Sequence, residues 1–203
     1  MKIMVTGFEP FADHAENPSQ LLVQGLPDRV KEDINLVTVL LPVDRVKAPQ
    51  IILTQLQRHQ PDAVLCFGLA AGRARISLEK VALNLLDFSI PDNQGLIVSD
   101  TPISAEGPTA FFSTLPIQSI LLSLKEAGIP AEISLCAGTY LCNLVFYTLM
   151  HEIARAGRPV PAGFIHLPAL PQQAALTEKP LPSLSLEMMI LSAEIIIAHL
   201  PKH

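Results

Sequence analysis

Short apolar runs of strand length alternate with longer segments of helical character along most of this chain. Strands are predicted at Lys2–Thr6, Ile34–Leu41, Asp62–Phe67, Ala131–Leu135 and Gly163–Leu167, and the first three are followed directly by Gly or Pro. This alternation favours an α/β fold with a mostly parallel or mixed twisted sheet and helices on both faces. Ligands in such folds gather beyond the carboxyl ends of the strands, so any site is expected at that edge.

The segments between the strands carry helix signals. Asn17 is a favoured N-cap, Pro18 fits the first turn, and the segment that they open leads to Gly25. Gly128 and Gly157 directly follow two further segments, as expected where helices end. The other predicted helices are Arg45–Arg58, Pro116–Ala127, Thr139–Ala156 and Ser183–Leu200.

The stretch from Ser89 to Pro108 is rich in Pro, Gly, Asp and Asn and has little periodicity. It predicts a long loop of the kind that covers a site. No segment of the 203 residues reads as a linker, so we expect one domain over residues 1–203.

The composition of the chain excludes several classes of binding partner. Hydrophobic residues make up 49% of the chain and charged residues 16%, which excludes a disordered chain and leaves apolar surface for another subunit. The net charge of −5 and the lack of a Lys/Arg-rich run argue against nucleic acid. The apolar runs are too short for a signal peptide or a membrane span, so we expect a soluble, cytoplasmic protein that binds no membrane.

Cys142 is the candidate nucleophile among the three cysteines. It follows Gly138, which permits a tight turn after the predicted strand, and Thr139, which can cap the helix that follows. This places its sulfur in the first helical turn, where the helix dipole favours a thiolate. Cys66 lies in an apolar strand and reads as a core residue, whereas Cys136 stays ambiguous. The odd number of cysteines, without metal-type spacing, predicts free thiols and neither a disulfide nor a metal site.

A thiol nucleophile needs an imidazole base within hydrogen-bond reach, and His166 is the best candidate. It lies at the end of a predicted strand, although a core histidine bonded to the backbone would look similar. His151 shares the helix of Cys142 but points to its opposite face. His14 is a weak competitor for the role of base. Surface positions are expected for the other three histidines: His59, His199 and His203.

Glu79 is the candidate for the third group, which orients the imidazole. It interrupts an apolar stretch, and a buried carboxylate without a partner is costly, so a partner is expected. The competing interpretation is an ion pair with Arg73, Arg75 or Lys80. The rival carboxylates are Asp87 and Asp92.

Seven ordered stretches together resemble the pyroglutamyl peptidase I (pyrrolidone-carboxylate peptidase) family. They span 6–11, 17–19, 68–73, 90–93, 112–116, 138–143 and 163–168, and include Gly138-Thr139-Tyr140-Leu141-Cys142-Asn143 and Gly163-Phe164-Ile165-His166-Leu167-Pro168. The resemblance implies a catalytic triad of Glu79, Cys142 and His166. It also implies that N-terminally pyroglutamylated peptides are hydrolysed, without metal or organic cofactor, by a homodimer or homotetramer.

The substrate of such an enzyme is a small uncharged lactam, so its pocket should be apolar with few polar partners. Phe8 and Phe11 resemble the aromatic residues with which the family clamps the ring, although core packing is the alternative for both. Leu69 and Asn17 are the other predicted substrate-binding residues.

The chain also departs from the family pattern. Ser89 stands where many members carry Arg, Cys136 where many carry Ser or Thr, and Arg45-Val46 where an aromatic-Gly pair is common. If the missing Arg holds the oxyanion or the loop, its loss predicts slower turnover, because one such donor contributes roughly 3 kcal/mol. Two alternatives therefore stay open: a cysteine amidase or acyl transferase with a pocket changed at Ser89 and Leu69, and a catalytically silent interaction protein.

Overall fold

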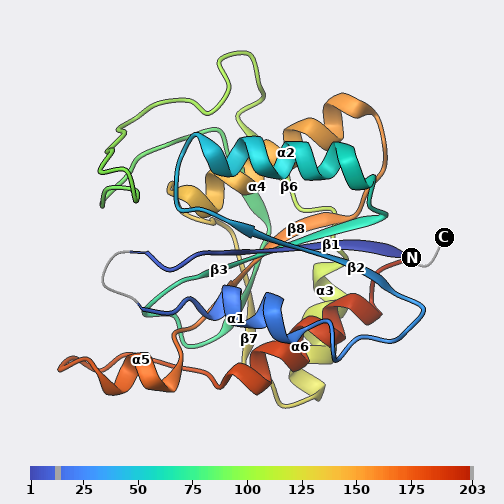
Figure 1. Ribbon diagram of the computed structural model, residues 1–203, viewed down its shortest axis with the longest axis vertical. Coiled ribbons are helices and arrows are strands. Elements are labelled where there is room, and N and C mark those ends of the chain that lie inside the picture. The colour runs from blue at the N-terminus through green and yellow to red at the C-terminus, as the bar shows by residue number, and fades with distance from the viewer. Residues whose placement is uncertain (12–14, 202–203) are drawn as a thin grey trace.

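The computed structural model describes residues 1–11 and 15–201 and is built on a six-stranded sheet (Figure 1). Its strand order is β2 (Asn35–Leu41), β1 (Lys2–Phe8), β3 (Ala63–Leu69), β8 (Ala162–Leu167), β4 (Ile76–Glu79) and β7 (Ala131–Ser134). All neighbours pair in parallel except β4 and β8, which are antiparallel. A separate antiparallel pair joins β5 (Val81–Leu83) to β6 (Ala110–Phe112).

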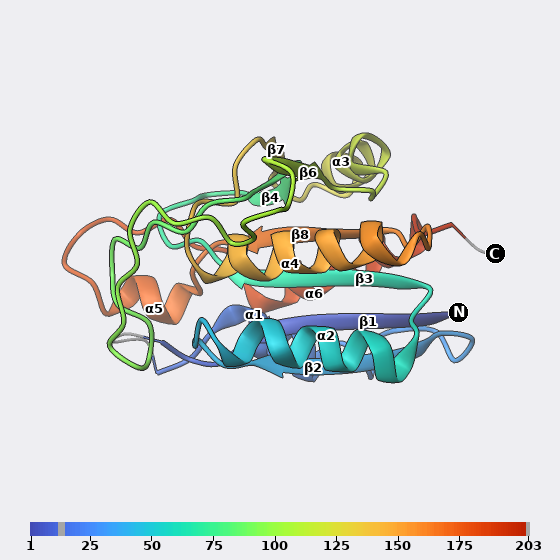
Figure 2. The same ribbon diagram turned by 90° about the horizontal axis from the view of Figure 1, so that it is seen from above.

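Helices cover both faces of the sheet (Figure 1). On one face lie α1 (Pro18–Gly25), α3 (Ile117–Glu126) and α6 (Leu186–Ala198), and on the other lie α2 (Lys47–His59) and α4 (Leu141–Ala156). Figure 2 shows α2 and α4 side by side along the strands. The short helix α5 (Pro171–Ala175) lies at the end of the molecule away from the N-terminus. The predicted fold class is confirmed.

Two hydrophobic cores result from the alternation of side chains along the central strands. Ile3 and Val5 of β1 pack into the core beneath α1, α3 and α6, whereas Met4 packs into the core beneath α2 and α4. In the same way, Phe67 of β3 packs into the first of these cores and Phe164 of β8 packs into the second. Because both faces of these strands are buried, the strands appear in the sequence as continuous apolar runs.

The five predicted strands and five predicted helices are present, with ends that shift by up to a few residues. Residues 89–108 form no helix or strand, as predicted, and Figure 2 shows this loop crossing the end of the sheet opposite the N-terminus. The elements that were not predicted from the sequence have five residues or fewer: β4, β5, β6 and α5. Within the described residues, none of the helices has the length and apolar character that crossing a bilayer requires.

Candidate active site

Three neighbouring strands bring Gly68, His166 and Glu79 to one face of the sheet. Gly68 of β3 is the register partner of His166 on β8, and Glu79 of β4 is the partner of Phe164, two residues before His166. Paired residues on adjacent strands point to the same face, and so do residues two apart on one strand. All these side chains therefore face α4, the helix that carries Cys142.

Cys142 reaches this face from the first turn of α4. Gly138 has a φ of +80°, which lets the chain turn sharply after β7, and the helix begins at Leu141. A Cβ atom on residue 68 would lie 2.9 Å from Sγ of Cys142 and 2.8 Å from Cζ of Phe164. The sulfur thus lies directly over Gly68, beside the strand position that His166 occupies.

This close approach makes a prediction for Gly68→Ala. The added methyl group must displace the thiol or the Phe164 ring, and such overpacking costs about 1–3 kcal/mol of stability. We expect a lower melting temperature and slower alkylation of Cys142 by iodoacetamide. The matched control is Gly25→Ala, whose Cβ would meet only the flexible Cδ1 of Ile190 at 3.1 Å. Equal alkylation rates in the two variants would contradict this placement of the thiol.

His166 and Arg73 converge on Glu79. Nδ1 of His166 lies 2.7 Å from Oε1 of Glu79, and Nη1 of Arg73 donates to the same oxygen at 2.6 Å. The Glu79 side chain is completely buried and that of His166 nearly so. Both partners considered for Glu79 from the sequence, the imidazole and an arginine, are therefore present together.

The charges of this cluster favour a carboxylate beside a neutral imidazole. Burial by itself raises the pKa of the Glu79 carboxyl, but His166, the Ser134 hydroxyl and Arg73 together hold that pKa below its ordinary value. Burial lowers the pKa of His166, against the opposing effect of Glu79. A neutral imidazole that donates from Nδ1 to a carboxylate leaves the lone pair of Nε2 free to accept a proton.

The thiol differs from the sequence-based expectation. Burial, reinforced by the charge of Glu79, raises the pKa of Cys142 to about 12, although Arg73 acts in the opposite direction. Cys142 is one of the residues that line a cavity, and it is only partly buried, so it keeps some contact with solvent. Desolvation outweighs the helix dipole here, and the resting group is a thiol rather than the expected thiolate.

Thr139 was also expected to cap α4, and this is wrong. Its hydroxyl donates to the carbonyl of Asp87 at 2.7 Å, and the N-cap residue is Tyr140, which makes no capping bond with its side chain. Thr139 instead joins the start of the long loop to the turn before Cys142.

A cavity of about 290 Å³ opens beside the thiol. It is lined by all four residues predicted to bind substrate and by four others: Phe8, Phe11, Asn17, Leu69, Val43, Tyr140, Leu141 and Cys142. Among the described residues that line it there is no carboxylate. Val43, Tyr140 and Leu141 were not predicted, although Tyr140 and Leu141 directly precede Cys142 in the motif that revealed the thiol.

The polar atoms of Asn17 are already used within the protein. Its Oδ1 accepts from the backbone N–H of Ser19 at 3.0 Å and from the Ser19 hydroxyl at 2.8 Å, and its Nδ2 donates to the Glu9 carbonyl at 3.1 Å. Asn17 is the N-cap of α1, as predicted, and it fixes the loop that carries Phe11.

The rival carboxylates are engaged elsewhere. Asp92 is buried and accepts from the backbone N–H groups of Arg45, Gln94 and Leu96, so it fastens the long loop. Asp87 is exposed and accepts from the Ser99 hydroxyl.

The other described histidines also have partners away from the thiol. His59 contacts Gln55, His151 packs on Phe111, and His199 contacts Ser123. His14 and His203 lie outside the described residues. Across residues 1–11 and 15–201, no group of three or more His, Cys, Asp or Glu side chains could hold a metal ion.

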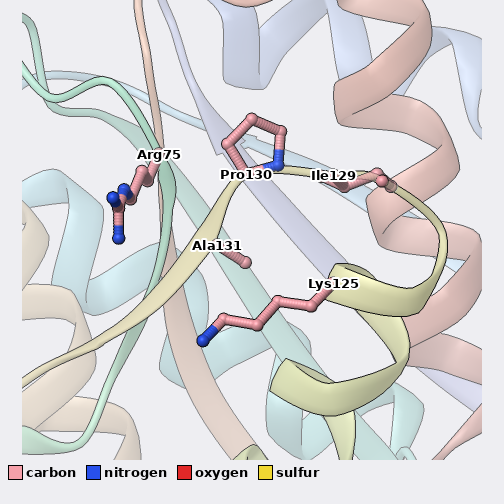
Figure 3. Close-up of a pocket in the computed structure, with 6 residues that line it drawn as sticks. Arg75, Lys125, Ile129, Pro130 and Ala131 are labelled. Atoms are coloured by element: carbon pink, nitrogen blue, oxygen red, sulfur yellow. The ribbon is translucent and has the colours of Figure 1, made fainter.

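A larger hollow of about 710 Å³ lies away from this cluster and is open to solvent (Figure 3). Arg75 and Lys125 border it, together with Gly128, Ile129, Pro130 and Ala131. Because none of the predicted site residues lines this hollow, we place the candidate site at the smaller cavity beside Cys142.

Known proteins are similar to this chain in sequence and in fold over almost their whole length. The family model described as pyroglutamyl peptidase matches residues 1–201. The pyrrolidone-carboxylate peptidase of Vibrio vulnificus is 42% identical over 196 residues, which cover 97% of this chain and 91% of that protein. The protein of the same name from Thermococcus onnurineus is 43% identical over 197 residues, which cover 97% of each chain.

Solved structures agree with these sequence matches. A mutant pyrrolidone carboxyl peptidase from Pyrococcus furiosus superimposes with a TM-score of 0.94 at 41% identity, covering 98% of this chain and 97% of that chain. Pyroglutamyl peptidase I from Bacillus amyloliquefaciens gives a TM-score of 0.93 at 38% identity, covering 98% and 93%. With a family match over residues 1–201 and relatives above 40% identity, the chain belongs to the pyroglutamyl peptidase family.

Proposed function

We propose that this protein is a cysteine peptidase that removes an N-terminal pyroglutamyl residue from peptides, with Cys142 as nucleophile, His166 as base and Glu79 as the orienting carboxylate. The observation that carries the proposal is the 2.7 Å contact between His166 and Glu79 beside a thiol that opens into a small apolar cavity. Family membership supports the same substrate class.

The proposed reaction begins with a proton transfer. As Sγ of Cys142 attacks the pyroglutamyl carbonyl carbon, Nε2 of His166 accepts the thiol proton, and Glu79 stabilises the imidazolium that forms. This coupling is needed because burial raises the pKa of the thiol to about 12, so little thiolate exists before substrate binds. The free backbone N–H groups in the first turn of α4 are suited to stabilise the oxyanion.

The second half of the reaction returns that proton. The imidazolium donates it to the nitrogen of the leaving peptide when the carbon–nitrogen bond breaks, which leaves a thioester on Cys142. A water molecule, deprotonated by His166, then attacks the thioester carbonyl, and the thiol and free pyroglutamate are released.

The cavity fits a neutral ring better than a charged amine. Phe8, Phe11 and Leu69 present apolar surface to it, and the described lining residues offer no carboxylate to pair with an ammonium group.

This pocket predicts selectivity for pyroglutamyl over prolyl amides. We expect at least about a hundredfold higher kcat/KM for a chromogenic pyroglutamyl amide, because proline lacks the ring carbonyl and carries a charged amine that would be desolvated without a partner. The two substrates are compared in the wild type, with Cys142→Ala as the blank. Comparable rates on both would contradict the lactam pocket while leaving the thiol chemistry intact.

We further propose that residues 1–203 form one peptidase domain that acts in the cytoplasm as a homodimer or homotetramer. Large apolar side chains are exposed at Ile97, Phe112 and Leu135, each by more than 60%, which supports association between copies. The described cysteines are free thiols, and a reducing compartment would keep Cys142 reactive.

The two alternatives make different predictions. An amidase or acyl transferase with an altered pocket would label at Cys142 but turn over other acyl amides better than pyroglutamyl amides. A silent interaction protein would hydrolyse none of these amides faster than its own Cys142→Ala variant. The assembled Cys142, His166 and Glu79 cluster favours an active enzyme.

A further inference from the structure

Arg73 occupies a position that the proposed triad does not explain. It lies in the turn after β3, where its backbone N–H donates to the Ala70 carbonyl at 3.1 Å, and its side chain remains 31% exposed. Despite that exposure, the guanidinium extends to the completely buried carboxylate of Glu79. An arginine on a loop is thus directed inward, toward the acid that orients the proposed base.

The two ends of the guanidinium join two parts of the site. Nη1 donates to Oε1 of Glu79 at 2.6 Å, and Nη2 donates to the backbone carbonyl of Cys136 at 3.3 Å. Cys136 begins the turn that leads to Cys142, and its own Sγ accepts from the Gly138 N–H at 3.3 Å. Arg73 therefore connects the orienting carboxylate to the turn that delivers the nucleophile.

Arg73 and His166 also share one oxygen. Because both bond to Oε1 of Glu79, a change in the guanidinium bond alters the charge and position of the atom that holds the imidazole. Arg is suited to this role, since its planar fork makes two hydrogen bonds at once and stays charged at all relevant pH values.

The charge of Arg73 acts on both reacting groups in the same direction. Glu79 raises the pKa of the Cys142 thiol and of His166, whereas Arg73 lowers both. The charged or titratable groups that face the thiol and the imidazole are Glu79 from β4, Arg73 from the turn after β3 and, for the thiol alone, Cys66 from β3 and Tyr140 from the N-cap of α4. Arg73 is the cation among them and partly offsets the carboxylate that opposes thiolate formation.

From this geometry we propose that Arg73 is a positioning residue of the active site. It holds Glu79 and the turn before Cys142 in their relative positions, and it partly offsets the effect of the Glu79 charge on the nucleophile. The inference rests on the proposed peptidase function, and it adds Arg73 as a fourth functional residue beside the proposed triad. Arg73 acts through Glu79.

The test compares Arg73→Gln with Arg75→Gln. Arg75 is the matched control because it is exposed, lies two residues away and borders the open hollow with Lys125 (Figure 3). In Arg73→Gln we expect kcat on a pyroglutamyl amide to fall about 10- to 100-fold, as for other groups that orient a functional side chain, with KM changed less than about threefold. Arg75→Gln should match the wild type.

The pH dependence separates positioning from a merely structural role. Without the cation both pKa values rise, so the acid limb of kcat/KM and the profile of Cys142 alkylation by iodoacetamide should both move to higher pH in Arg73→Gln. Arg73→Lys, which keeps the charge but not the fork, should retain the wild-type profiles and recover only part of kcat.

The proposal would be overturned if the pH profiles of Arg73→Gln superimposed on those of Arg75→Gln. It would also be overturned if the pH profiles of Arg73→Lys shifted as far as those of Arg73→Gln. If Arg73→Gln fails to fold, the kcat of Arg73→Lys decides: a lowered kcat with unchanged profiles supports the positioning role, and a kcat equal to that of the wild type overturns it. The measurement of Cys142 alkylation by iodoacetamide needs no substrate. A wild type that hydrolyses no pyroglutamyl amide would therefore refute the proposed function, while alkylation would still test Arg73 separately.

Discussion

Cys142→Ser is expected to lower kcat on a pyroglutamyl amide by about 10⁴-fold or more, the scale on which removal of a nucleophile acts in a catalytic triad. A serine hydroxyl is far less acidic than a thiol, so the imidazole of His166, which burial keeps neutral, would have to remove a much less acidic proton. The oxygen is also smaller than sulfur and would lie farther from the substrate carbon. The measurement is single-turnover kinetics on purified protein, with the melting temperature recorded for each variant.

The other two cysteines provide the controls for this variant. Cys136 is exposed, so Cys136→Ser should keep nearly full turnover. Cys66 is completely buried in β3 and does not line the cavity, so we expect it to take no part in the reaction. Cys66→Ser places a hydroxyl in the core and should lower stability before it lowers turnover. Substantial activity in Cys142→Ser would refute the assignment of the nucleophile.

His166→Ala is expected to reduce kcat by about 10⁴-fold or more, and Glu79→Gln by a smaller factor. Histidine transfers the proton in both halves of the proposed reaction, whereas Glu79 orients the ring through the 2.7 Å contact and stabilises the imidazolium. Glutamine can still accept from Nδ1, but it carries no charge. Stopped-flow measurements on the two variants, each at the pH of its maximum, would give this ranking.

Glu79→Gln also distinguishes catalysis from fold stability. Glu79 pairs with Arg73 as well as with His166, so the substitution should lower the melting temperature in addition to kcat. If kcat stays at the wild-type level while the protein unfolds more easily, Glu79 serves as an ion-pair anchor and the triad loses its third member. Arg73→Gln gives the comparison, because it removes the ion pair and leaves the carboxylate.

The sequence alone predicted the fold class and most of the candidate site. The strands at Lys2–Phe8, Ala63–Leu69 and Ala162–Leu167 are buried on both faces, so continuous apolar runs followed by turns revealed them. Cys142 was placed in the first turn of a helix because Gly138 permits the sharp turn that precedes it. The family resemblance then selected Phe8, Phe11, Leu69 and Asn17, which the structure brings to one cavity.

The partners of Glu79 were decided only by the tertiary structure. Its strand β4 has four residues, too few for periodicity to identify, and it enters the sheet antiparallel to β8. That pairing of distant segments sets Glu79 diagonally across from His166 and within reach of Arg73. Local sequence patterns hold no information on such pairing, so the sequence could offer the imidazole and the arginine only as competing partners.

The protonation state of Cys142 could not be predicted from the sequence either. The position at a helix N-terminus favours a thiolate, but the pKa of about 12 depends on how much protein surrounds the sulfur and on the charge of Glu79. The sequence determined which chemical groups this protein has and the secondary structure that carries most of them. The packing of α4 over β3, β8 and β4 decided which groups meet and which of them are charged, because desolvation and Coulomb interactions depend on distances that only the folded chain defines.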